Sequence, residues 1–71
     1  MQNKLGEAQN FYRKALSLHP DHPDFLSNFA NLKIRTGDIV GAQKMVKKAL
    51  EIDSEHRNAL QLLRDIERSS F

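Results

Sequence analysis

The sequence predicts an all-α fold in which four antiparallel helices form stacked helix–turn–helix repeats, a short segment of an α-solenoid. The first observation is an internal repeat: residues 8–9 and 14–16 recur unchanged as residues 42–43 and 48–50. This 34-residue period is the length of one helix–turn–helix unit. The second observation is that apolar residues recur at spacings of three and four in four segments, and none of these alternates with a period of two. The third is that proline, glycine and aspartate separate the segments.

The first two helices are expected over residues 3–18 and 23–36. Pro23 suits the first turn of the second helix, where its missing N–H leaves no hydrogen bond unmade. Asp24 suits the positive end of the helix dipole. Gly37 can adopt the left-handed conformation that ends this helix.

The third and fourth helices are expected over residues 38–52 and 56–69. Asp38 is the predicted N-cap of the third helix, and Ser54 the predicted cap of the fourth. The connections are two to six residues long, so neighbouring helices should run antiparallel.

The unit from Pro23 to His56 resembles the tetratricopeptide repeat family. The resemblance consists of large and small residues at fixed offsets on either side of the turn Gly37-Asp38. The positions that carry it are Leu26, Phe29 and Ala30 in the first helix, and Ala42, Val46, Ala49 and Leu50 in the second.

The resemblance implies a single domain over residues 1–71 that begins and ends in part of a repeat. Residues 1–22 correspond to the second helix of a partial repeat, and residues 23–56 to one complete repeat. Residues 57–71 correspond to the first helix, or a capping helix, of a following partial repeat. Arg64 stands where the family usually has a small residue, which disfavours packing of another unit after this helix.

In this family the first helices line a concave groove, and their polar residues hold extended peptides. Asn28 and Asn31 are the strongest candidates, because a side-chain amide offers both a donor and an acceptor to a peptide backbone. Their spacing is similar to that in repeats of glycosyltransferase-like proteins, where asparagines form a ladder. The alternative is that asparagine is simply tolerated on an exposed face. The candidate groove residues are Asp24, Ser27, Asn28, Asn31, Arg35, Asn58, Gln61 and Asp65.

The first helix should lack part of its cover, because each helix of such a repeat packs on its own partner and on the next unit. We therefore expect self-association, as a homodimer with exchanged helices, through this face; the alternative is a monomer with a partly exposed helix. Core packing is expected for both Phe11 and Tyr12. The candidate self-association residues are Leu5, Ala8, Tyr12 and Ala15.

Composition disfavours several other classes of function. The chain has no cysteine, which leaves no thiolate metal ligand and fits a reducing, cytoplasmic compartment. Its net charge is +2 with both signs interspersed, so no nucleic-acid partner is expected. No apolar run reaches the length of a membrane span, so no membrane insertion is expected. The three histidines are expected to be exposed turn residues, with no metal and no cofactor.

The sequence predicts a module that binds a protein or peptide partner and is not an enzyme. It contains no nucleophile with a base at helical spacing and no glycine-rich phosphate loop. Two alternatives remain open. The chain is a self-assembly segment, or it is the non-catalytic scaffold piece of a larger repeat protein, such as a glycosyltransferase-like protein.

Overall fold

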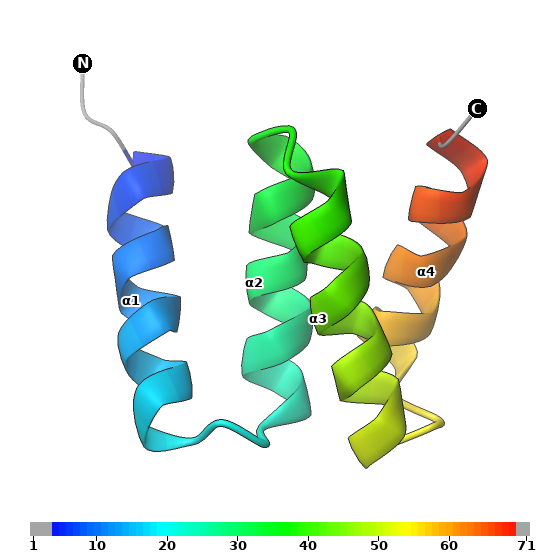
Figure 1. The fold of residues 1–71 in the computed structure, drawn as a ribbon, viewed down its shortest axis with the longest axis horizontal. Helices are drawn as coiled ribbons and strands as arrows, with labels where there is room; N and C mark the ends of the chain where they lie inside the picture. The colour runs from blue at the N-terminus through cyan, green and yellow to red at the C-terminus, as the bar shows by residue number, and fades with distance from the viewer. Residues whose placement is uncertain (1–3, 70–71) are drawn as a thin grey trace.

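Four helices account for nearly all of the structure, a computed structural model that describes residues 4–69. They are α1 (Lys4–Leu18), α2 (Pro23–Arg35), α3 (Ile39–Ile52) and α4 (Arg57–Ser69). Successive helices run in opposite directions (Figure 1). The molecule is a slab of 34 × 31 × 17 Å, so the helices lie side by side in a shallow stack. The predicted all-α repeat architecture is confirmed, with each helix end within one residue of its expected place.

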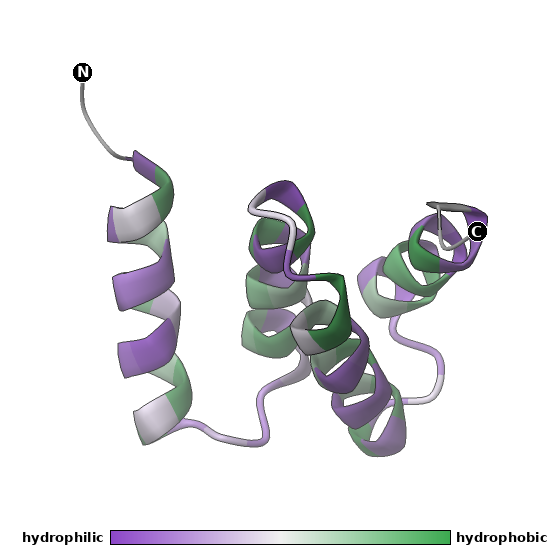
Figure 2. Cartoon of the chain, turned by 45° about the horizontal axis from the view of Figure 1, so that its top comes forward, coloured by the Kyte–Doolittle hydropathy of each residue, from purple (hydrophilic) through white to green (hydrophobic). Residues whose placement is uncertain are grey.

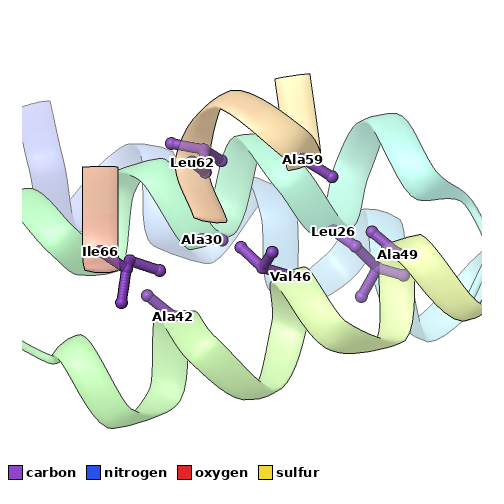
Figure 3. Close-up of a cluster of buried hydrophobic side chains, with 8 residues drawn as sticks. All are labelled: Leu26, Ala30, Ala42, Val46, Ala49, Ala59, Leu62 and Ile66. Carbon is purple, nitrogen blue, oxygen red and sulfur yellow. The ribbon is translucent and has the colours of Figure 1, made fainter. Parts of the chain in front are cut away.

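The core lies where α2, α3 and α4 meet (Figure 3). Four of its members are alanines with no exposed surface, and such small side chains let helix backbones approach closely. The larger members fill the space between them. The buried cluster consists of Leu26, Ala30, Ala42, Val46, Ala49, Ala59, Leu62 and Ile66.

The turn between α2 and α3 forms as the sequence predicts. Gly37 has a φ of +92°, a conformation that residues with a Cβ rarely adopt. Asp38 is the N-cap of α3, because its Oδ1 accepts a hydrogen bond from the Gly41 N–H at 3.0 Å. The Lys33 ammonium lies 3.2 Å from the other carboxylate oxygen of Asp38. These contacts stabilise the turn that joins α2 to α3.

The predicted cap of α4 is wrong. Because α4 begins at Arg57, Ser54 lies too early in the chain to reach the free N–H groups of its first turn. The cap is His56, whose Nδ1 accepts a hydrogen bond from the Ala59 N–H at 3.2 Å. Asp53 shapes the turn before it, through an Oδ1 that accepts from the Glu55 N–H.

Helix α1 packs against α2 alone among the described helices and contributes no fully buried residue. Figure 2 shows α1 set apart from α3 and α4. Tyr12 is half-buried, and its ring stacks on that of Phe29 with centroids 6.1 Å apart. Phe11 does not join the core as expected: 61% of its surface is exposed, and it contacts Tyr12 edge-on. The reason is that Phe11 points away from α2, the one helix that α1 contacts.

Candidate functional site

A hollow of about 300 Å³ lies between α2 and α4. Its walls come from the polar faces of α2 and α4. The apolar faces of the same helices point into the core, which leaves amide and carboxylate groups along the hollow. The lining residues are Ser27, Asn28, Asn31, Asn58, Gln61, Leu62 and Asp65.

A second, smaller hollow of about 180 Å³ lies between α1 and α2. Asn28 and Asn31 line this hollow as well as the first one. Both asparagines are exposed, and neither amide is hydrogen-bonded to another group within residues 4–69. We call the two hollows together the groove across α1, α2 and α4; these asparagines lie between its two parts and line both. The second hollow is lined by Ala8, Tyr12, Asn28, Asn31, Leu32 and Arg35.

The structure brings seven of the eight candidate residues to this groove, but their side chains differ in what they can offer. Ser27 is fully buried and its hydroxyl donates to the Asp24 carbonyl at 3.1 Å, so it forms part of the floor. Gln61 donates from Nε2 to Asp65 Oδ1 at 3.1 Å, which makes these two residues one connected polar unit. Arg35 is exposed and lines the hollow beside α1. The groove thus has a cation in one hollow, a carboxylate in the other, and amides in both.

Asp24 is the candidate that lies outside both hollows. Its Oδ1 is 2.6 Å from Nε2 of His56, which joins the first turn of α2 to the start of α4. Because His56 Nδ1 accepts from the Ala59 N–H, Nε2 carries the proton and donates to the carboxylate. This hydrogen bond is the main reason that the pKa of Asp24 is lowered. Asp24 and His56 link one repeat unit to the next.

We expect the free energy of unfolding to fall as the pH drops from about 4 towards 2. The pKa of Asp24 is lowered by the His56 hydrogen bond, and that of Asp38 by the Gly41 N–H and by Lys33, from an ordinary value of 3.8. A carboxylate whose pKa is lower in the folded state stabilises that state above its unfolded pKa and loses this effect as pH falls through the folded pKa. Urea unfolding at several pH values measures how steeply the free energy of unfolding depends on pH.

The control for this prediction is an aspartate without a partner. Asp21 is exposed and makes no hydrogen bond within residues 4–69, so D21N should leave the slope between pH 4 and 2 nearly unchanged. The double variant D24N/D38N should flatten it. An equally steep slope in both variants would assign the acid sensitivity to other groups.

The histidines precede α2 and α4 and make ring contacts or hydrogen bonds. The rings of His19 and His22 meet edge-on with centroids 6.4 Å apart, and His22 stacks on Phe25 at 4.2 Å. Over residues 4–69 no group of three potential ligands converges. Within the same residues, no helix is both long enough and apolar enough to cross a bilayer.

Comparison with known proteins agrees with this architecture. The sequence model of the tetratricopeptide repeat family matches residues 1–66. The chain belongs to the tetratricopeptide repeat family. The groove across α1, α2 and α4 therefore lies on a helical face of a tetratricopeptide repeat protein, and its role in binding stays a prediction.

Two curated proteins are similar over part of the chain. Both are described as a probable biofilm formation methyltransferase WspC, one from Pseudomonas aeruginosa and one from Pseudomonas putida. The first is 46% identical over 43 residues, 61% of this chain and 10% of the relative. The second is 39% identical over 49 residues, 69% of this chain and 12% of the relative. The chain thus spans about a tenth of the length of these relatives. No solved structure matches it.

Sequence reasoning missed the His56–Asp24 link, although a signal for it was present. His22 and His56 stand 34 residues apart, directly before the first helix of two successive units. A polar residue at a helix start is a capping candidate, and an imidazole has a second nitrogen left to bond elsewhere. Reading the histidines only as metal ligands or exposed turn residues left this possibility aside.

Proposed function

We propose that the chain binds an extended segment of a partner protein along the groove across α1, α2 and α4. The observation that carries the proposal is that Asn28 and Asn31 line both hollows and have amides that bond to no other described group. A side-chain amide can donate to a peptide carbonyl and accept from a peptide N–H at once. Two such amides one helical turn apart can therefore hold a partner's main chain.

The size and polarity of the groove favour an extended segment over a helix. A helix with its side chains is about 10 Å wide and would have to fit into two small hollows, of about 300 and 180 Å³. Both hollows are lined mainly by polar groups. A helix in this groove would leave its apolar face against amides and carboxylates. An extended segment instead offers unpaired N–H and C=O groups along its whole length.

The proposed role is recognition without catalysis. The groove holds amides, a buried hydroxyl that is already hydrogen-bonded, and one charged group in each hollow. These groups bind and orient a peptide, and they do not form a nucleophile with its base. The likeness to two proteins described as methyltransferases supports a place for this chain as an interaction segment of a larger protein of that kind.

The test uses a defined probe. Peptides of 12 residues are selected from a random display library against the intact chain, and their affinity is measured by fluorescence anisotropy. The double variant N28A/N31A should weaken binding by about tenfold or more, because each amide contributes about 1 kcal/mol through its hydrogen bonds. The thermal unfolding midpoint should stay the same or rise slightly, since alanine is the better helix former.

The matched control is N10A. Asn10 is an exposed asparagine of α1 that lines neither hollow. Its replacement should leave peptide affinity unchanged. Equal affinities for the wild type and for N28A/N31A would reject the groove as the binding site.

A further inference from the structure

The second helix of a repeat unit occurs twice in this chain, in two different surroundings. Helix α3 is the second helix of the complete repeat, and α1 is its counterpart 34 residues earlier. The central residues of α3 have no exposed surface: Ala42, Val46 and Ala49. The residues one period earlier in α1 remain half-exposed: Ala8, Tyr12 and Ala15. The same pattern of small and large residues is covered in one helix and open in the other.

The missing cover corresponds to one particular helix. Helix α3 packs against α2, the first helix of its own unit, and against α4, the first helix of the next. Helix α1 packs against α2, the next unit, and against no first helix of its own within residues 4–69. Met45 in α3 is half-buried against the core, whereas its counterpart Phe11 is 61% exposed. Phe11 therefore marks the side of α1 where a first helix would lie.

A second, independent observation comes from the two equivalent histidines. His56 precedes α4 and binds the carboxylate of Asp24, the second residue of the first helix one unit earlier. His22 precedes α2 in the same way, but residues 4–69 contain no helix of an earlier unit. Its Nδ1, the atom that in His56 accepts from the Ala59 N–H, is buried without a hydrogen-bond partner among these residues, and its ring stacks on Phe25. Its Nε2, the atom that in His56 binds Asp24, makes no hydrogen bond or ion pair with a described residue. His22 thus lacks the acidic partner that its counterpart has.

Helix α4 of a second copy does not fit against the open face of α1. In a head-to-tail pair of copies, α4 of one copy would lie on α1 of the other as α2 lies on α3. It would place Arg64 where the fully buried Ala30 stands, and Asn58 where Asp24 stands. A guanidinium at a site that holds an alanine with no exposed surface cannot pack closely. The occupant must have a small residue there.

We propose that the open face of α1 binds an amphipathic helix that is not part of residues 1–71, in the way that α2 binds α3. This helix carries a carboxylate in its first turn, which accepts a hydrogen bond from His22 Nε2. It carries an alanine or glycine at the position equivalent to Ala30, and large apolar residues that cover Phe11. The face shares Ala8 and Tyr12 with the hollow between α1 and α2, whereas Phe11 lines neither hollow, so a change at Phe11 tests this proposal apart from the proposed function.

The probe is a synthetic peptide with the sequence of residues 21–37, which contains α2 and its ends. Titrated into the isotope-labelled chain, it should shift the backbone resonances of α1 and the ring nitrogens of His22. A peptide carrying D24A should bind about tenfold more weakly, because a hydrogen bond to a charged group is lost. A peptide carrying A30R should not bind.

Variants of the chain locate the contact. F11E should abolish binding. V40E should not, because Val40 is 64% exposed and lies on α3, which is not in contact with α1. Because an isolated helix of this length is marginal in water, the same segment is also joined covalently. A copy of residues 19–38 placed directly before Leu5 reproduces the junction between Asp38 and Ile39.

The joined helix should raise the thermal unfolding midpoint by about 10 °C, and A30R within the added copy should remove the gain. An unchanged midpoint would overturn the proposal, as would a gain that survives both D24A and A30R in the copy. Sedimentation of the original chain supplies a further check. A dimer that buries Phe11 would show that a second copy, and not a separate helix, occupies this face.

Discussion

The variant A30R is expected to lose the cooperative unfolding transition at room temperature. Ala30 has no exposed surface and lies in the seam where α2 meets α3 and α4. An arginine there must either push the helices apart or bury an unpaired charge, and such changes cost about 4 kcal/mol or more. A domain of this size has a total stability of about 3–5 kcal/mol. Far-ultraviolet circular dichroism during a urea titration measures the loss.

The matched control is R64A, at the same repeat position one unit later. Arg64 is exposed, so its removal should change the free energy of unfolding by no more than about 0.5 kcal/mol. A folded and stable A30R would mean that the helices are not in the close contact described. A large loss in R64A would mean that Arg64 has a structural role.

The variant I66A should lose about 2–5 kcal/mol of stability. Ile66 is 2% exposed and is the largest fully buried side chain, and it holds α4 against α2 and α3. Its truncation leaves a cavity between helices that can close only if α4 moves. Since α4 supplies one wall of the groove, the loss should also reduce peptide binding at temperatures where the rest of the chain is folded. Urea unfolding and amide hydrogen exchange of α4 measure the two effects.

The comparison is L18A, which removes the same number of carbon atoms at a side chain that is 69% exposed. It should change stability by no more than about 0.5 kcal/mol. Similar losses for I66A and L18A would contradict the assignment of the core to the α2–α3–α4 side of the molecule.

The fold was predictable because its signals are local and repeated. Three kinds of signal act within a few residues of the chain: the apolar spacing that defines each helix, Pro23 at one helix start, and Gly37 at one helix end. The 34-residue repeat then fixes how the helices pair, because equivalent residues must meet equivalent surroundings. The core of the complete repeat follows from the same pattern.

The details that the sequence did not predict depend on contacts between units. The choice of His56 over Ser54 as the cap of α4 depends on where the turn places each residue and on a carboxylate 32 residues away. Phe11 was expected in the core because its spacing is helical, but spacing cannot show which helices α1 contacts, and among the described helices that is α2 alone. The groove positions were predicted on α2 and α4, whereas the second hollow required the actual tilt of α1.

The position of Asn28 and Asn31 between two hollows has a consequence for how a partner would be held. A ligand that fills one hollow orders amides that also form the wall of the other, so the entropic cost of ordering them is met only once. Occupancy of the two hollows is then thermodynamically coupled, and a segment long enough to span both gains affinity beyond the sum of two short ones. Length, as well as composition, would select the partner.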